Sequence, residues 1–468
     1  MIFGNRKRES ISRRGFLQQA GGGVLGGGAA AGALLNLNLM GKLAAEEAPA
    51  DESYRALVCV FLQGGNDSYN MLVPRGESEY EEYAEVRGSL SLPREDLLSL
   101  TGPLNQGKEL GLHPSLTRLK EIYEGGEAAF VSNVGTLQQP TTRADYEANA
   151  SLLPKGLFSH SDQQRQWQTA VADRAAKSGW LGRMADVIQS GDDLNHYASA
   201  ISVSGINLSQ TAPETVPYVI GPDGSRGLFE WDEARWSHGK QAVLSQLDLE
   251  TDSLLQKAFL QRKKRAIELN ESFSSALDEA ETERPDFGAN RLSNQLEMVF
   301  EVIQAREVLG LRRQTFFVML GGWDHHSELL GPHADLLGQL DLALGSFQTA
   351  LNEAGLGESV TTFTASDFGR SLTSNGQGSD HGWGGNQLVL GGAVNGGEVY
   401  GAYPDLYLDS PFDVGRGRML PTTSVDEYFA ELACWFGISR NQLPVILPHL
   451  NRFYDLQGTS PPLGFMGS

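Results

Sequence analysis

The fold is decided by the stretch RALVCVFLQGGND, which runs from Arg55 to Asp67. Its apolar residues are continuous rather than alternating, which indicates a strand covered on both faces, as in a parallel or mixed α/β sheet. The run ends in a glycine turn, and the polar residues Asn66 and Asp67 follow. In open α/β sheets ligands bind beyond the carboxyl ends of the strands, so these polar residues are candidates for a site.

The same order, an apolar run followed by polar residues, recurs twice. TFFVMLGG leads to Asp324 and His326, and VTTFTAS leads to Asp367. Strands that alternate with helices predict an α/β fold with a mainly parallel central sheet flanked by helices. We expect a single domain over residues 51–468 that carries a helical insertion at about 207–311. Further predicted elements are a strand at 128–135, helices within 112–126, 161–176 and 178–191, two or three helices within 240–311 broken near ERPDFGAN, and a helix at about 334–354.

Residues 1–50 have the features of an export signal. Basic residues precede SRRGFLQ (Ser12–Gln18), a weakly hydrophobic glycine- and alanine-rich stretch follows, and Ala48-Pro49-Ala50 offers a cleavage site. Twin arginines followed by Phe-Leu resemble the twin-arginine signal, which exports folded proteins. We therefore expect a periplasmic or secreted protein that uses the twin-arginine export machinery. The alternative is a membrane anchor, but the stretch is too rich in glycine for a good spanning helix.

Charge and cysteine content exclude several classes of function. The chain carries a formal net charge of −21, so no basic surface indicates nucleic-acid binding. Such a charge is compatible with bound cations. Its two cysteines, Cys59 within an apolar run and Cys434, form no disulfide framework and do not indicate cysteine catalysis.

Carboxylates at three strand ends, with imidazoles nearby, predict a metal or catalytic site. So much uncompensated negative charge is costly, and divalent cations with oxygen and nitrogen ligands, such as Zn²⁺, Mn²⁺, Ca²⁺ or Mg²⁺, would offset it. Each residue also has a structural interpretation. Asp67 could be a turn or helix-cap residue, His325 and His326 could lie on the surface, and Asp380 could hold His381 by a structural hydrogen bond.

Several motifs together resemble a known family. They are the twin-arginine signal, FLQGGNDSYNMLVP, LHPSL, LFSHSDQQRQWQ, GGWDHH, FTASDFGRS and GSDHGWGGNQLVLGGAV. This set resembles the exported bacterial domain-of-unknown-function family 1501 over nearly all of the chain after the signal. That family is grouped with the alkaline phosphatase–sulfatase superfamily, which places two metal ions at the carboxyl edge of the sheet. The resemblance thus implies an alkaline phosphatase-like domain.

The resemblance also implies metal ligands. Asp67 matches the aspartate after the first strand, and Asp324 with His326 matches an aspartate–histidine pair after a middle strand. The superfamily usually has three residues within that pair where this chain has one, and His325 remains an alternative.

Two alignments are open for the third part of the pattern. Either Asp380-His381 is the aspartate–histidine pair at the end of a strand, or Asp367 ends the strand, Phe368 replaces the histidine, and His381 is the later histidine before a glycine. We favour the second, because VTTFTAS is the better strand. It predicts one site of Asp324, His326 and His381, and a second of Asp67 and Asp367 that Asp380 or His160 could complete. The expected cofactor is a divalent metal, zinc first, with manganese or calcium as alternatives.

A hydrolase of this superfamily also needs a nucleophilic hydroxyl near a helix N-terminus. Ser159 beside His160 is our first choice, and Ser161 is the second, since it could equally be the helix N-cap. Candidates for binding the substrate are Arg165, Arg370 and Asn66, with Arg143 as a further arginine.

The predicted function is an exported, metal-dependent hydrolase of phosphate or sulfate esters whose substrate is a small molecule or a saccharide ester. The chain lacks the C-x-P-S-R signature, so sulfatase chemistry through an oxidised cysteine is not indicated. One alternative is a non-catalytic binding or assembly protein with a degenerate metal site and an unknown protein partner. Another is a carbohydrate-active protein that stacks tryptophans on sugar rings.

Overall fold

The computed structural model describes residues 53–102, 105–188, 196–224, 245–247, 253–280 and 285–467. These residues belong to one unit, Ala48–Ser468. The predicted export signal, residues 1–50, lies outside the described residues. Among the helices that are described, none combines the length and the apolar character needed to cross a membrane.

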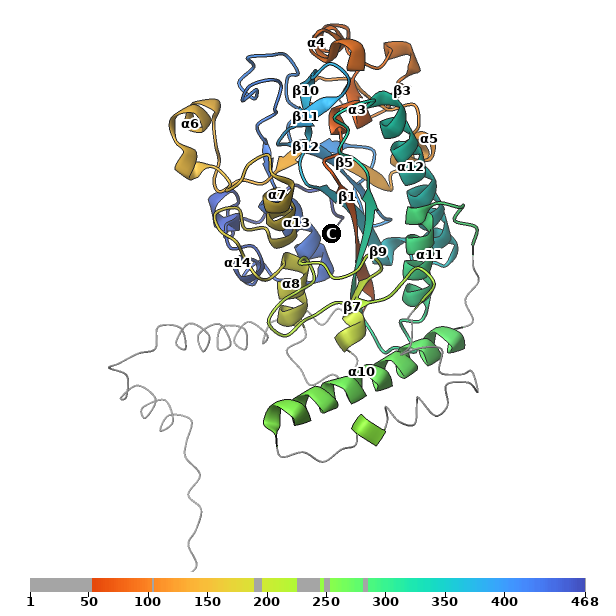
Figure 1. The fold of residues 1–468 in the computed structure, drawn as a ribbon. Helices are drawn as coiled ribbons and strands as arrows, with labels where there is room; N and C mark the ends of the chain where they lie inside the picture. Colours follow the sequence, from red (N-terminus) through yellow and green to blue (C-terminus); the bar gives the residue numbers. More distant parts are fainter. Residues whose placement is uncertain are drawn as a thin grey trace, which may run out of the picture. The chain divides into compact units, whose positions relative to one another are not determined.

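A nine-stranded sheet forms the centre of the unit, in the order β13-β5-β12-β9-β1-β8-β6-β7 with β14 beside β5 (Figure 1). The pairs from β9 through β1, β8 and β6 to β7 are parallel, and β12 runs antiparallel to both β5 and β9. The prediction of a mainly parallel central sheet is therefore confirmed. Its strands are β1 (Arg55–Gln63), β5 (Ala128–Gly135), β6 (Ala200–Ser202), β7 (Tyr218–Val219), β8 (Arg313–Gly321), β9 (Val360–Ser366), β12 (Gly385–Leu390), β13 (Val399–Tyr400) and β14 (Thr423–Ser424).

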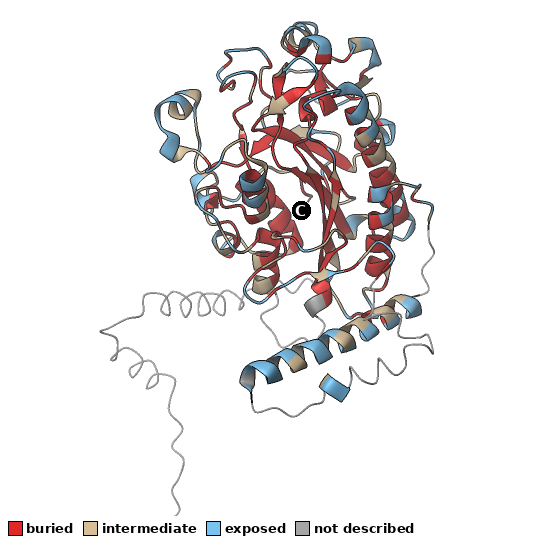
Figure 2. Ribbon diagram, viewed as in Figure 1, coloured by how far each residue is buried: buried red, intermediate tan, exposed pale blue. Residues whose placement is uncertain are grey.

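Strand β1 lies between β9 and β8, and its side chains point alternately to the two faces of the sheet. Both faces are buried, which is why the sequence of this strand is continuously apolar (Figure 2). Ala56, Val58, Val60 and Leu62 join the hydrophobic core on one face, and Leu57, Cys59 and Phe61 join the core on the other.

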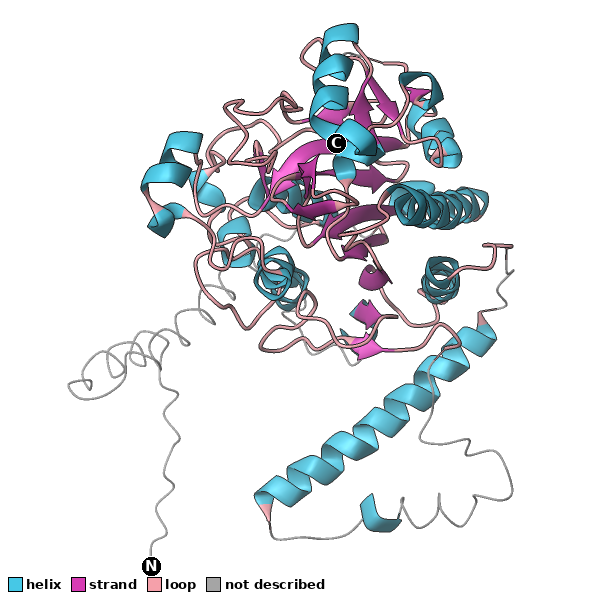
Figure 3. Ribbon diagram, turned by 45° about the horizontal axis from the view of Figure 1, so that its top comes forward, coloured by secondary structure: helices cyan, strands magenta, loops and turns pink. Residues whose placement is uncertain are grey.

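Helices cover both faces of the sheet (Figures 1 and 3). One core includes α5 (Thr117–Glu124), α11 (Arg291–Gln304) and α12 (Leu330–Glu353). The other includes α7 (His160–Thr169), α8 (Trp180–Ile188), α13 (Val425–Phe436) and α14 (Leu443–Ile446). The remaining described elements are α3 (Ser68–Met71), α4 (Glu77–Arg87), α6 (Arg143–Ala148), α10 (Leu254–Glu279), a sheet of β2 (Leu72–Pro74), β4 (Leu110–Leu112) and β3 (Leu98–Ser99), and a hairpin of β10 (Arg370–Ser374) and β11 (Ser379–His381).

The range predicted as a helical insertion contains α10 and α11, and also the sheet strand β7. The side-chain oxygen of Asn290 caps α11 by accepting hydrogen bonds from two backbone N–H groups, and the helix packs against β8 and α12. Helix α10 differs, because Leu255 and Phe259 near its start are exposed while Phe273 near its end is buried. Because it packs against β8 and α12, α11 is part of the layer that covers the sheet.

The turn after β1 requires glycine. Gly64 has a φ of +122°, and a methyl group on it would lie 2.6 Å from the backbone nitrogen of Asp324 and 2.9 Å from that of Trp323. We expect Gly64→Ala to lower the free energy of unfolding by more than about 2 kcal/mol, because a strained backbone alone costs about 1–3 kcal/mol and the clash adds to it.

Urea denaturation of the two proteins measures this effect. The matched control is Gly355→Ala, since Gly355 also has a positive φ, +69°, but has nothing within 4 Å of the added methyl group. The control should lose only about 1–2 kcal/mol from its left-handed backbone. Equal losses in the two variants would show that the close approach to Asp324 has no energetic weight.

Candidate metal centre

The three strand ends with polar residues lie side by side, as the sequence predicts. Strands β9, β1 and β8 are neighbours and parallel, so their carboxyl ends share one edge of the sheet. The turn after β1 joins the other two ends, because the N–H of Gly64 donates to Asp367 Oδ1 at 3.2 Å and the N–H of Trp323 donates to the Gln63 carbonyl at 3.2 Å. Asp324 and Asp367 thus stand on either side of the end of β1.

Helix α7 brings a histidine to this edge. The Nδ1 of His160 is 2.6 Å from Asp367 Oδ2, and its Nε2 is 3.4 Å from Asp324 Oδ2. Gln164, one turn further along the helix, donates to the same Asp367 oxygen at 2.8 Å. The backbone just before α7 is strained, since Phe158 has a φ of +70°. Such strain is found preferentially at functional sites.

The hairpin β10–β11 brings His381, and the end of β8 brings His326. His381 Nε2 is 3.3 Å from Asp324 Oδ1, and His326 Nε2 is 3.1 Å from the same oxygen. The two Nε2 atoms are 2.9 Å apart. The ligand atoms of His160, Asp324 and His381 lie within 4.8 Å of one another, and His326 extends this group through its contacts with Asp324 and His381. We call these four residues the metal centre.

In each imidazole Nε2 faces Asp324, and Nδ1, the outer nitrogen, has an acceptor. His381 Nδ1 is 2.8 Å from the carbonyl oxygen of Phe158, which can only accept, so Nδ1 carries the proton and Nε2 of the neutral ring has a lone pair. The same reasoning applies to His160, whose Nδ1 meets the Asp367 carboxylate.

His326 completes the pattern, because its Nδ1 is 3.4 Å from Asp380 Oδ1. The Nε2 atoms of three histidines therefore surround the Asp324 carboxylate. In His160 and His381 the proton lies on Nδ1, so Nε2 of the neutral ring carries a lone pair. Lone pairs and a carboxylate repel one another unless a cation lies close to them. The Arg370 guanidinium is one such cation, at 2.6 Å from Asp324 Oδ1, and a metal ion among the Nε2 atoms would be another.

These residues fit a zinc ion or a similar divalent cation. Histidine nitrogens and one carboxylate are the ligands zinc prefers, and metal–ligand bonds of about 2.0–2.2 Å at tetrahedral angles place ligand atoms about 3.3–3.5 Å apart. The distance of 3.3 Å from Asp324 Oδ1 to His381 and that of 3.4 Å from Asp324 Oδ2 to His160 are of this size. The contacts of His326 are shorter, at 3.1 Å to Asp324 Oδ1 and 2.9 Å to His381 Nε2. Asp324 is 42% exposed, so an ion and a substrate could reach the centre from solvent.

The surrounding charges and burial favour a neutral His381 ring and an ionised Asp324 carboxylate. Burial lowers the pKa of His381, and the nearby His160 and Arg370 lower it further, so a proton is a poor substitute for a metal ion on this ring. Burial on its own raises the pKa of Asp324, but the hydrogen bond and charge of Arg370 outweigh it, and the pKa lies below its usual value. At neutral pH the centre therefore offers an ionised carboxylate and an unprotonated imidazole.

The second predicted group of ligands, Asp67 and Asp367, has a different environment. Asp67 is completely buried and forms an ion pair with Arg87, which is also completely buried. The guanidinium also donates to the carbonyls of Ser371 and Leu372 at 3.1 Å and 3.2 Å. A fixed cation thus already neutralises Asp67, and Asp367 is engaged with His160, Gln164 and Gly64.

The structure also places the other predicted residues. Asp380 is bonded to Arg416 at 2.6 Å and to Asn375 at 3.2 Å, so its oxygens are used at the rim of the centre. His325 is buried against the His333 ring, with a centroid distance of 6.1 Å, and lies apart from the metal centre that His326 joins. Phe368, which the favoured alignment places at a histidine of the superfamily pattern, packs against His160 and His381 with centroid distances of 4.8 Å and 4.6 Å.

The predicted nucleophiles lie at the start of α7. Ser159 is at the N-cap position without a side-chain cap bond, and its Oγ is 3.2 Å from that of Ser161. Arg165 is exposed one turn after Ser161, on the same side of the helix. Hence the serines and Arg165 flank His160 on one helix.

Arg370 and Asn66, two further predicted substrate residues, are bonded within the protein. Arg370 is fully buried, donates to Asp324 Oδ1 at 2.6 Å and to the Gly64 carbonyl at 3.3 Å, and bonds the Ser379 carbonyl. Asn66 is buried and its Oδ1 is 3.1 Å from His333 Nε2. In this structure Arg370 positions Asp324.

Sequence reasoning missed the residues that orient the imidazoles. The Phe158 carbonyl carries no side-chain signal, and Arg87 lies twenty residues beyond Asp67 on a separate helix. Gln164 could have been found, because it follows His160 by four residues and so lies on the same face of a predicted helix.

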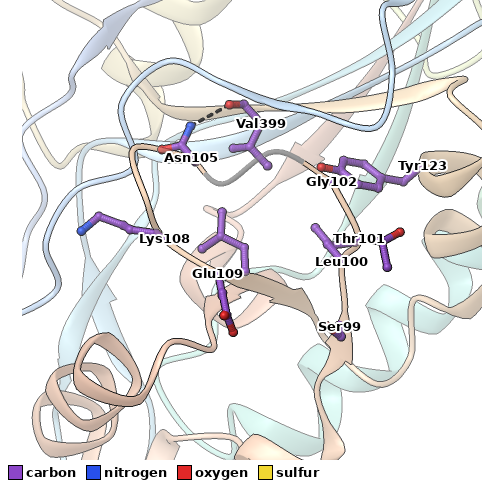
Figure 4. A pocket seen from close by; sticks show the side chains of 10 residues that line it. Ser99, Leu100, Thr101, Gly102, Asn105, Lys108, Glu109, Tyr123 and Val399 are labelled. Carbon is purple, nitrogen blue, oxygen red and sulfur yellow. Dashed lines mark hydrogen bonds between the residues drawn. The ribbon is translucent and has the colours of Figure 1, made fainter.

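A pocket of about 320 Å³ lies elsewhere, between the turn that joins β3 to β4 and strand β13 (Figure 4). No residue of the metal centre lines it. Two of its polar side chains have internal partners, since Asn105 Nδ2 donates to the Val399 carbonyl at 2.6 Å and Lys108 pairs with Asp405 at 2.6 Å.

A family model described as "Protein of unknown function (DUF1501)" matches residues 54–443. None of the curated proteins matches the chain in sequence.

Three solved structures illustrate the similarities in fold. The soluble domain of lipooligosaccharide phosphoethanolamine transferase A from Neisseria meningitidis has a TM-score of 0.34 at 10% identity, covering 86% of this chain and 95% of its own. The C-terminal periplasmic domain of EcEptC from Escherichia coli, in complex with Zn, has a TM-score of 0.34 at 11% identity, covering 89% and 94%. The PsFucS1 sulfatase from Pseudoalteromonas sp. has a TM-score of 0.32 at 11% identity, covering 86% and 72%. Similarities of this size transfer neither a substrate nor a metal to this chain.

Proposed function

This chain belongs to the DUF1501 family, and we propose that it is an exported, metal-dependent hydrolase of phosphate or sulfate esters. The observation that carries the proposal is the inward orientation of imidazoles around the Asp324 carboxylate, with the outer nitrogens bonded to Asp367, Phe158 and Asp380. Export is supported by the signal-like sequence of residues 1–50.

The centre is proposed to hold one divalent cation, with zinc as the first choice and manganese or calcium as alternatives. Asp324, His160, His381 and His326 would be the ligands. A second cation beside Asp67 is disfavoured, since Asp67 is completely buried and paired with Arg87, whereas Asp324, although paired with Arg370, is 42% exposed and faces three imidazoles. A bound cation would polarise an ester oxygen and favour the ionised form of a nucleophile.

The side chains around the centre have distinct roles in this proposal. Asp367 holds His160 with its proton on Nδ1, and Arg370 keeps Asp324 ionised and in place. Arg165, exposed on α7, is available for the negative charge of a small-molecule or saccharide ester.

The nucleophile is Ser159 or Ser161, both close to the N-terminus of α7, where the amide dipoles favour negative charge. The serine Oγ loses its proton and forms a bond to phosphorus or sulfur, and the ester oxygen leaves and takes up a proton. Water then attacks the same atom and releases the serine with its proton restored. The covalent serine ester is the intermediate.

The test is turnover of para-nitrophenyl phosphate and para-nitrophenyl sulfate by the zinc-loaded protein. Removing an activated nucleophile should lower kcat at least about 100-fold, so we expect this loss for the Ser159→Ala, Ser161→Ala double variant. The control is Ser151→Ala, an exposed serine whose hydroxyl bonds Asn149, which should leave kcat unchanged. Full activity in the double variant would reject serine attack.

A second candidate function is favoured by a specific observation. Arg87 neutralises Asp67, which matches a metal-ligand aspartate of the superfamily, and Phe368 replaces a ligand histidine in the alignment that we favour. A protein that binds one cation and a partner or saccharide without turnover fits these replacements. Zinc-loaded protein that hydrolyses neither ester would favour this binding protein over the hydrolase.

A further inference from the structure

A short loop with the sequence Gly-Arg-Gly-Arg, residues 415–418, lies beside the metal centre. Its first three residues have consecutive positive φ values of +106°, +62° and +67°. The middle one, Arg416, is not a glycine, so its backbone is strained. The conformation of this loop must be held by its surroundings.

The surroundings that hold the loop are specific. Asp413 Oδ1 accepts hydrogen bonds from the N–H groups of Gly415 and Gly417 at 2.7 Å and 2.9 Å. The Thr373 hydroxyl donates to the Arg416 carbonyl at 2.9 Å. A methyl group on Gly417 would lie 2.6 Å from Leu372 Cβ, so the loop is packed directly against β10. The loop is therefore built to present its two arginines in fixed positions.

Arg416 reaches the rim of the metal centre. It pairs with Asp380 at 2.6 Å, and the other oxygen of Asp380 is 3.4 Å from His326 Nδ1. The Arg416 side chain is 54% exposed, so it could also contact a ligand from solvent.

Arg418, two residues further along the loop, lies over an aromatic ring. Its guanidinium carbon is 4.4 Å from the centroid of the Phe158 ring, and the Phe158 carbonyl is the acceptor that orients His381. Within the described part of the chain, Nε of Arg418 is buried without a hydrogen-bond partner, and the guanidinium forms no ion pair.

We propose that Arg416 and Arg418 form an anion subsite that receives the charged oxygens of a phosphate or sulfate group next to the metal centre. This inference rests on the proposed function and names the residues that would recognise its substrate class. The planar guanidinium of arginine can donate two parallel hydrogen bonds to two oxygens of such a tetrahedral anion. Stacking on Phe158 fixes the orientation of the Arg418 guanidinium before the anion binds.

Inorganic phosphate and inorganic sulfate are the probes, titrated by calorimetry into the full-length, zinc-loaded protein. We expect Arg418→Ala to weaken phosphate binding by at least about tenfold, since a lost charge-assisted bond has about this effect. Arg418→Lys should recover only part of the loss, because it keeps the charge without the planar guanidinium. Arg416→Ala should have a smaller effect, since Arg416 already shares its charge with Asp380.

Arg306→Ala is the matched control. Arg306 also lies over an aromatic ring, at 5.4 Å from Tyr54, and pairs with Glu307 at 3.2 Å. It is remote from the metal centre, so phosphate affinity should stay as in the wild type.

Zinc content is measured on every sample, so that a failure of the anion subsite can be distinguished from a failure of the proposed function. If zinc-loaded Arg418→Ala binds phosphate as the wild type does, or if the zinc-loaded wild type binds neither anion, the anion subsite is wrong and the metal centre stands. If the wild type binds no zinc, the proposed function fails, and the subsite fails with it.

Discussion

Asp324→Asn is expected to abolish stoichiometric zinc binding. The carboxylate is the one group that touches all three imidazoles of the centre, at distances of 3.1 Å to 3.4 Å from His326, His381 and His160. An amide is neutral and presents one oxygen instead of two. The loss of a mere outer-shell partner lowers metal affinity about 10–100-fold, so the loss of this ligand should exceed about 100-fold.

The substitution should also lower stability, because the fully buried Arg370 loses its carboxylate partner. The loss should be smaller than for a pair buried on both sides, since Asp324 is 42% exposed and Arg370 keeps the carbonyls of Gly64 and Ser379. Zinc titration followed by mass spectrometry of the native protein measures the affinity, and circular dichroism checks the fold.

Asp380→Asn is the matched control for this experiment. Its carboxylate lies on the same rim, but its oxygens bond Arg416, Asn375 and the outer nitrogen of His326. We expect this variant to keep one zinc per chain. If the two variants lose zinc equally, Asp380 is a ligand, and the alignment that pairs Asp380 with His381 is the correct one.

Arg87→Met is expected to have the largest effect on stability. Both Arg87 and Asp67 are completely buried, and removing one partner of a buried ion pair leaves an uncompensated charge that costs about 3–5 kcal/mol. The variant also deprives the carbonyls of Ser371 and Leu372 of their donor, which loosens the contact between α4 and β10. Urea denaturation, with the free energy of unfolding extrapolated to water, measures the loss.

A second substitution separates charge from packing. Asp67→Asn in the Arg87→Met background removes the stranded carboxylate, so the double variant should be more stable than Arg87→Met alone. Arg94→Met is the control, because Arg94 is half-buried and donates to the Arg75 carbonyl at 2.8 Å; it should lose less than about 1.5 kcal/mol. An Arg87→Met variant as stable as this control would show that the buried pair contributes little.

The sequence predicted the parts of the fold that depend on local patterns. Strands β1, β5, β8 and β9 lie where continuous apolar runs were found, because such runs are typical of strands buried on both faces. The neighbourhood of Asp324 and Asp367 also followed from pattern, since parallel strands bring their carboxyl ends to one edge.

The details of the site depend on how elements far apart in the sequence pack together. His160 joins Asp324 only because α7 docks over the end of β9 and Asp367 orients the ring. The pairing of Asp67 with Arg87 depends on the packing of α4 against β10, and no local pattern contains that information. The motifs therefore predicted the edge of the sheet where the site lies, but they did not predict that Arg87 neutralises Asp67 there.

The most direct test is the metal content per chain, measured by plasma mass spectrometry on the protein recovered after export. We expect one equivalent of a divalent cation, zinc foremost, since one carboxylate and three imidazoles converge while Arg87 neutralises Asp67. Two equivalents would contradict the role given to Arg87, and no stoichiometric metal would contradict the metal centre itself.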